Sequence, residues 1–198
     1  MDSSLPFFMF FMKSLMVSLI GMDFDRGLKM LKDYIETDSI ASDVAIDGPT
    51  PVGSIRLAGL AAHTKLSEIE QSMGKVIDEV HSKLRDADID TNGQWVSLYD
   101  DMNLKTQEMD YMTGMVLPTG TDAPRGLVER TVPSFEAMKV THTGKYQHLG
   151  NAFFAAYQNA RAAKRKVKRK RPALEIYRNS PDETPPEQLI TELYLPLK

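Results

Sequence analysis

The chain has 198 residues, of which 42% are apolar and 26% charged, and this ordinary composition predicts a soluble globular protein with a buried core. It contains no cysteine, which excludes disulfides and thiol catalysis and fits a reducing cytoplasm, so we expect a cytoplasmic protein. Its four histidines are scattered without a paired motif, so we expect no metal site and no cofactor. The net charge of −3 is unevenly spread, because residues 164–171 hold seven of the 24 lysines and arginines. The rest of the chain has 17 basic residues against 27 acidic ones and is therefore acidic.

The N-terminal segment, residues 1–38, is predicted to be helical, with a break near Gly21 and a second helix over residues 23–36. Its apolar stretch, residues 5–20, lacks a basic leader and a small-residue cleavage site, and Lys13 interrupts it. We therefore predict an apolar-faced helix and no membrane span. Such a face must be covered by the following domain, by a second copy in a homodimer through these helices, or by a further segment.

The remaining elements follow from turn residues and from the spacing of apolar residues. Residues 39–51, rich in Ser, Asp, Gly and Pro, are predicted to be a linker before a domain over residues 52–198. Apolar residues recur at helical spacing in two stretches, 64–85 and 146–166. The predicted strands are residues 52–63, 95–99, 106–117, 127–132, 136–143, 173–178 and 189–196. This order predicts an α+β domain in which a β-α-β-β unit occurs twice and builds a mainly antiparallel sheet with two helices.

Three motifs in the C-terminal part carry a family resemblance. Residues 142–150 read HTGKYQHLG and lead into FFAAY at 153–157, with LEIY at 174–177 and TELYLPL at 191–197. In this order they resemble the GyrI-like, or bacterial transcription-activator effector-binding, family over residues 51–198. The resemblance implies a duplicated β-α-β-β fold, a ligand groove between the two helices, and a buried carboxylate on the sheet that faces drug-like, often cationic, small molecules.

The N-terminal residues 1–38 more weakly resemble the end of a polyketide-cyclase-like, START-type domain. Some members of the GyrI-like family follow a DNA-binding domain, but no helix-turn-helix precedes the domain in this sequence. We therefore expect a small-molecule ligand as the partner and no direct DNA binding by this chain.

The candidate site centres on Glu175. Strand alternation places Glu175 and Tyr177 on one face of their strand, and an apolar, aromatic setting raises the pKa of an unpaired carboxylate. The alternative is a structural glutamate paired with Arg178, Arg171 or a tyrosine hydroxyl. The resemblance implies that Glu175 is the pocket carboxylate. The predicted ligand-binding residues are Glu175, Tyr177, Tyr111, Met109, Trp95, Tyr99, Phe153, Tyr157, Glu192 and Tyr194, with core packing as the alternative for each aromatic residue and structural support for Glu192.

Three functions are consistent with this site. The first is a binding module that senses or sequesters an amphipathic or cationic compound. The second is a hydrolase of strained electrophiles, an activity reported for some members of the family, in which Glu175 would be the catalytic acid or base. The third is tetrapyrrole binding, known for related domains and little supported by the histidines.

Two other motifs have simpler interpretations. Residues 88–93 match the first half of an EF-hand loop, but Tyr99 occupies the twelfth position where a bidentate glutamate is needed, so a polar turn is predicted. The basic run 164–171 could grip phosphates, but its place after a helical stretch favours a solvated helix end.

Overall fold

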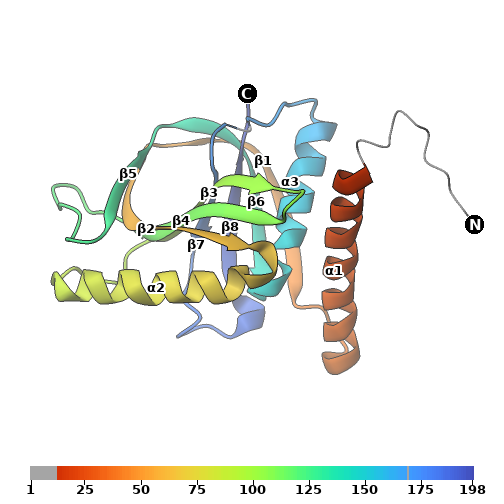
Figure 1. Cartoon of the computed structure of the whole chain (residues 1–198), viewed down its shortest axis with the longest axis horizontal. Coiled ribbons are helices and arrows are strands. Elements are labelled where there is room, and N and C mark those ends of the chain that lie inside the picture. The colour runs from red at the N-terminus through yellow and green to blue at the C-terminus, as the bar shows by residue number, and fades with distance from the viewer. Residues whose placement is uncertain (1–12, 169) are drawn as a thin grey trace, which may run out of the picture.

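The computed structural model describes residues 13–168 and 170–198 and contains one eight-stranded antiparallel sheet with three helices (Figure 1). The helices are α1 (Lys13–Thr37), α2 (Ile69–Asp86) and α3 (Gly150–Ala162). The strands are β1 (Ser42–Val52), β2 (Ile55–Lys65), β3 (Trp95–Asn103), β4 (Glu108–Val116), β5 (Val128–Val132), β6 (Phe135–Gly144), β7 (Ala173–Tyr177) and β8 (Ile190–Pro196). Short 3-10 turns, η2 (Leu66–Glu68), η3 (Tyr146–His148) and η4 (Pro186–Gln188), precede α2, α3 and β8.

The sheet order, β1-β6-β8-β7-β3-β4-β2-β5, confirms the predicted α+β fold with duplicated units. One unit is β2-α2-β3-β4 and the other is β6-α3-β7-β8, and they meet where β3 pairs with β7. A further strand precedes each unit and pairs with the opposite one, since β1 pairs with β6 and β5 with β2. The two units therefore exchange strands and build a single sheet.

The sheet curls so that its two ends approach each other. Only residues 53–54 join β1 to β2, and only residues 133–134 join β5 to β6, although each pair of strands lies toward opposite ends of the sheet order. Two residues cannot span an open eight-stranded sheet. Inside the curl, Val52 of β1 and Val132 of β5 belong to one buried apolar cluster with Leu98 and Leu174 of the central strands.

The two C-terminal helices cover separate parts of the other face. Helix α2 packs on β2 and β4, where Val80 and Leu84 are fully buried. Helix α3 packs on β6, β8 and β1 through small side chains four residues apart, Ala152, Ala156 and Ala160. The central strands β3 and β7 lie between the area that α2 covers and the area that α3 covers. We call the surface of β3 and β7 on the side of the helices the inter-helix strip.

The predicted linker, residues 39–51, is largely strand β1, so that prediction was wrong. Its turn-forming residues are tolerated because β1 is an edge strand, where a proline need not donate a ladder hydrogen bond. A bulge between Ile46 and Gly48 absorbs the irregularity, and Gly48 adopts a φ of +93°. Val44, Ile46 and Val52 supply the strand pattern that the turn residues obscured.

Two helix predictions also need correction. Helix α1 runs without interruption through Gly21, whereas a break was predicted there; the part of that prediction that falls on residues 1–12 lies outside the described residues. Helix α3 ends at Ala162, so the basic run does not extend it to residue 166. The described residues after α3 instead lead back towards β7, and Val167 forms a β-bridge with Leu197.

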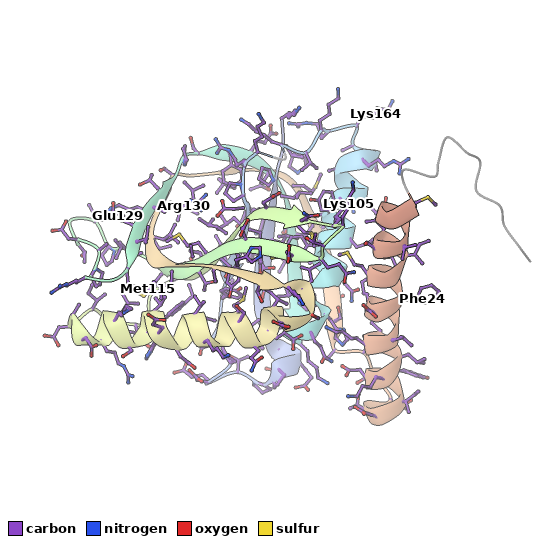
Figure 2. All side chains as sticks on the ribbon, in the orientation of Figure 1. Phe24, Lys105, Met115, Glu129, Arg130 and Lys164 are labelled. Carbon is purple, nitrogen blue, oxygen red and sulfur yellow. The ribbon has the colours of Figure 1, made fainter. Side chains whose placement is uncertain are left out.

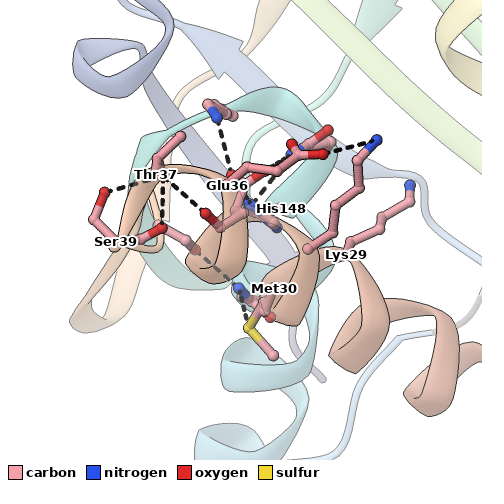
Figure 3. Close-up of polar contacts among 12 residues, drawn as sticks. Lys29, Met30, Glu36, Thr37, Ser39 and His148 are labelled. Atoms are coloured by element: carbon pink, nitrogen blue, oxygen red, sulfur yellow. Dashed lines mark hydrogen bonds and ion pairs between the residues drawn. The ribbon is translucent and has the colours of Figure 1, made fainter.

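Helix α1 is fastened to the body through a buried carboxylate (Figure 3). Asp33 is only 4% exposed and accepts hydrogen bonds from Lys145, Gln147 and His148 at 2.9–3.0 Å. The bonds from His148 and Lys145 lower the pKa of Asp33 to about 2, although burial opposes this. All three donors lie at the entrance to α3, so Asp33 sets the position of α1 beside that helix.

Within residues 13–168 and 170–198, no helix is both long and apolar enough to cross a membrane.

Candidate ligand-binding site

Glu175 lies in the middle of the inter-helix strip. On β7, Leu174 and Ile176 point into the curled core, and alternation turns Glu175 to the side that bears the helices. Glu175 pairs in register with Ser97 of β3, which pairs in turn with Thr113 of β4. The carboxylate is only 1% exposed, so the fold holds a titratable group inside the protein.

A chain of hydroxyl groups leads across the sheet to this carboxylate. Tyr99 donates a hydrogen bond to Glu175 Oε2 at 2.7 Å, and Tyr177 donates to the same oxygen at 3.0 Å. Ser97 lies 3.0 Å from the Tyr177 hydroxyl and 2.8 Å from that of Thr113. Because Tyr177 gives its only hydroxyl proton to an ionised Glu175, Ser97 must donate to Tyr177 and Thr113 to Ser97. Such an aligned chain strengthens each of its bonds.

The second carboxylate oxygen of Glu175 accepts no hydrogen bond. Glu175 Oε1 is buried and has no hydrogen-bond partner, and no lysine, arginine or histidine forms a salt bridge with Glu175 among the described residues. A buried ionised carboxylate with a free acceptor is costly, and a cation is the partner that would relieve the cost. The arrangement therefore presents an acceptor oxygen without its counter-charge.

The pKa values of the site follow from burial. Desolvation raises the pKa of Glu175 to about 7, and the bonds from Tyr99 and Tyr177 offset only part of the shift. Burial and the nearby carboxylate raise the pKa of both tyrosines well above their usual value. The tyrosines thus remain donors near neutral pH, while Glu175 exchanges its proton there.

Aromatic rings surround the carboxylate. Tyr99 makes an edge-to-face contact with Phe153 of α3, with ring centroids 5.6 Å apart. Tyr146 of η3 meets Tyr177 in the same manner at 5.7 Å. Burial and the charge of Glu175 raise the pKa of Tyr146 to about 12. The structure therefore brings together four of the residues predicted from the sequence: Glu175, Tyr177, Tyr99 and Phe153.

Four other predicted residues lie on the same side of the sheet but farther from the carboxylate. Tyr111 is the register neighbour of Tyr99 and binds Ser72 of α2 at 2.7 Å. Met109 lies two residues before Tyr111 on β4 and is buried. Trp95 stacks with a histidine of α2 and donates to a backbone carbonyl, so packing accounts for it. Tyr157 is half exposed and lies one helical turn beyond the α3 aromatic residue that contacts Tyr99.

Glu192 and Tyr194 lie on the opposite face of the sheet from Glu175. Glu192 pairs in register with Ile176, so it shares the face of the curled core. Burial raises its pKa, but hydrogen bonds from Arg178, Tyr194 and Lys139 outweigh burial and bring it to about 2. The two acids of the C-terminal strands therefore differ, since Glu192 has counter-charges and Glu175 has none.

Sequence reasoning did not include three contributors to the site. Ser97 and Thr113 supply the hydroxyl chain, and Tyr146 covers Tyr177. Strand alternation places Ser97 on the same face as Trp95 and Tyr99, and Thr113 on the same face as Tyr111, so the sequence did indicate the side of the sheet on which these hydroxyls lie. The pairing register that sets Ser97 opposite both Thr113 and Glu175 was not readable from the chain.

Two of the four histidines, His142 and His148, are buried and bonded within the protein. His142 Nε2 lies 3.0 Å from the Ser42 hydroxyl, and His148 binds Asp33. Burial, and the nearness of His148, lowers the pKa of His142 to about 4. No group of three or more histidine and acidic residues in residues 13–168 and 170–198 is arranged to hold a metal ion.

The fold is a single curled antiparallel sheet with two flanking helices, an α+β architecture, and a buried carboxylate lies between the helices. The description of the matching family agrees, since residues 51–198 match the GyrI-like small molecule binding domain. The chain belongs to the GyrI-like family.

Solved structures share this fold at low sequence identity. EcmrR in its DNA complex aligns with a TM-score of 0.62 and 17% identity over 93% of this chain and 65% of that chain, so this chain spans about two thirds of its length. The EcmrR C-terminal domain aligns with a TM-score of 0.60 and 18% identity over 79% of this chain and 98% of that chain. SAV2435 bound to tetraphenylphosphonium aligns with a TM-score of 0.55 and 16% identity over 76% of this chain and 92% of that chain. No curated protein matches the chain.

Proposed function

We propose that the chain binds lipophilic organic cations at Glu175 and acts as a cytoplasmic sensor or sequestering protein. The observation that carries this proposal is the unpartnered Oε1 of a fully buried carboxylate. Electron-rich ring faces beside a carboxylate attract flat or bulky cations whose charge is spread over apolar surface. The tetraphenylphosphonium bound in the structure of SAV2435 is such a cation and supports this ligand class.

Binding requires the aromatic cover to move. Glu175 is closed from solvent in this structure, whereas Tyr99, Tyr146, Phe153 and Tyr177 are each partly exposed. A ligand would therefore displace Tyr146 or Phe153 from the contacts they make with the two donor tyrosines. The displaced rings would then form the walls around the cation.

The test is calorimetric titration of the protein with tetraphenylphosphonium at several pH values between 5 and 9. The ionised carboxylate is the binding form, so below a pKa of about 7 the affinity should fall by about tenfold per pH unit. Glu175→Gln should abolish this pH dependence and weaken binding at pH 8 by at least about a hundredfold. The control Glu187→Gln changes the net charge equally at an exposed position and should bind like the wild type. Equal binding by both variants would refute the assignment.

A second candidate function is hydrolysis of strained electrophiles. The pKa of about 7 favours it, because a general acid or base works best when its pKa lies near the operating pH. Glu175 would protonate the electrophile or activate water, with Tyr99 or Tyr177 as the second polar group. Turnover of an epoxide by the wild type, lost in Glu175→Gln, would support catalysis; cation binding without turnover would leave binding as the function.

We also propose that α1 mediates homodimerisation. In Figure 2 the Phe24 side chain lies on the side of α1 that faces away from the body. Six large apolar side chains, spaced three or four residues apart, are each more than half exposed: Val17, Ile20, Phe24, Leu28, Leu31 and Ile35. A stripe of this size calls for a partner surface, and a second α1 supplies a matching one.

Light scattering after size-exclusion chromatography tests the dimer. The wild type should show twice the mass of the chain, and Phe24→Glu should shift the equilibrium to monomer. Val128→Glu, at an exposed apolar position on β5, should leave the mass unchanged. A wild type that is monomeric at every concentration would refute homodimerisation.

A further inference from the structure

Part of the basic run lines an open hollow in the protein surface, which we call the cavity. A hollow of about 260 Å³, open to solvent, lies between the β5–β6 connection and the segment that leads into β7. Its charged lining is entirely cationic and consists of Arg130, Lys168, Lys170 and Arg171. The helix-end interpretation of the run does not hold, because α3 ends before it and these residues meet another part of the sheet.

The backbone on the side of the run is fixed at several points. Val167 bridges Leu197, and the Lys168 amide donates to the Pro196 carbonyl at 2.8 Å. The Arg171 amide donates to the Lys168 carbonyl at 3.0 Å and closes a turn. Lys168 and Arg171, on either side of the turn, are therefore held by backbone hydrogen bonds close to the start of β7.

The two arginines of the cavity are held in place. Arg130 makes a two-pronged ion pair with Asp100, at 2.5 and 2.6 Å. Arg171 donates to the carbonyl oxygens of Pro133 and Ser134, and its guanidinium lies 5.0 Å from the centroid of the Phe135 ring. Both donors are thus pre-positioned, which lowers the entropy cost of engaging a ligand.

The two lysines have no such partners. Lys168 and Lys170 are exposed and form no salt bridge among the described residues. The cavity thus gathers four cations against the single carboxylate of Asp100, on a chain whose other residues are predominantly acidic. Concentration of uncompensated charge in a concave site favours a compact anion over a broad, flat surface.

We propose that this cavity binds a small phosphate-bearing molecule of the pyrophosphate class. Two adjacent phosphoryl groups would engage the donors of Arg171 that the Pro133 and Ser134 carbonyls leave free on one side and the ammonium groups of Lys168 and Lys170 on the other. Arg130 contributes a second fixed guanidinium beside them. The site is separate from the Glu175 site and takes ligands of the opposite charge.

The test is calorimetric titration with inorganic pyrophosphate at low and at physiological ionic strength. The wild type should bind one equivalent, and the double variant Lys168→Gln/Lys170→Gln should bind about a hundredfold more weakly, as expected when two charge-assisted hydrogen bonds are lost. The control Lys75→Gln/Lys105→Gln removes the same charge at exposed positions and should bind within about twofold of the wild type. Thermal unfolding verifies that both double variants are folded.

Three results would overturn the proposal. The first is the absence of saturable binding at low ionic strength, and the second is an equal loss in both double variants, which would indicate only the overall charge. The third is binding of duplex DNA without binding of pyrophosphate, because the basic residues would then form a nucleic-acid surface. None of these results depends on cation binding at Glu175, so the two sites are tested independently.

Discussion

Replacing Glu175 with glutamine should stabilise the protein at alkaline pH, while it removes the carboxylate that we propose binds the ligand. The wild-type carboxyl has its pKa raised from 4.5 to about 7 by burial. In the unfolded chain it ionises near 4.5, so the folded state binds the extra proton between these two pH values. Stability consequently falls as pH rises through this window, by about 3 kcal/mol once Glu175 is ionised.

Glutamine imitates the protonated carboxyl. Its side-chain oxygen can still accept the hydrogen bonds of Tyr99 and Tyr177, and it never ionises. At pH 4.5 the two proteins should therefore differ in unfolding free energy by less than about 1 kcal/mol, while at pH 8 the variant should be more stable by about 3 kcal/mol. Other titrating groups, such as Asp33 and Glu192, occur in both proteins and cancel in the difference.

Urea unfolding at both pH values measures the difference, with fluorescence of Trp95, the only tryptophan, as the probe. The slope of free energy against urea concentration should be the same for both proteins. A stability difference that is equal at pH 4.5 and pH 8 would refute the reasoning, since it would mean that Glu175 does not carry a raised pKa. A wild type that gains stability over the variant at pH 8 would refute it more strongly.

Three further substitutions test the surroundings of the site. Tyr177→Phe removes one of two hydrogen bonds to the Glu175 carboxylate, so its pKa and with it the pH midpoint of the proposed tetraphenylphosphonium binding should rise, as calorimetry would show. Asp33→Ala leaves its buried donors unpaired and should cost about 3 kcal/mol and speed amide exchange in α1, whereas the exposed Asp23→Ala should do neither. Gly144→Ala should destabilise by about 2 kcal/mol in urea unfolding, because φ is +138° and a Cβ would lie 2.0 Å from a backbone oxygen; Gly53→Ala, with nothing within 4 Å, is the control.

The elements of the domain were predictable because their patterns are local. Helix α2 repeats its apolar residues at helical spacing, and β7 and β8 alternate, so both appeared near their true positions. Strand β1 was missed because its stability comes from pairing with β6, while its own composition, with Gly48, Pro49 and Pro51, is that of a loop. A strand defined by its partner has no complete signature of its own.

The positions of the candidate site residues were only partly predictable. Alternation correctly placed Glu175 and Tyr177 on one side of their strand, and the hydrogen bond between them is the tyrosine pairing that was the structural alternative for Glu175. The pairing partners of β7 could not be inferred, because register depends on the whole sheet. Glu192 illustrates the limit, since its motif resembles that of Glu175 but its position in the alternation points it to the opposite face, where Arg178 and Lys139 neutralise it.

The location of Glu175 explains why a cation would be preferred over a neutral ligand of equal size. A neutral ligand that buries the carboxylate more deeply raises its pKa further and leaves it protonated, and gains only apolar contact with Tyr99 and Phe153. A cation gains the same contact and in addition removes the cost of about 3 kcal/mol that ionised Glu175 imposes on the free protein at pH 8. If cations bind at Glu175 as proposed, the cost of its unpaired charge is the energy difference that discriminates between the two ligand classes, and the discrimination should disappear as the pH falls below 7.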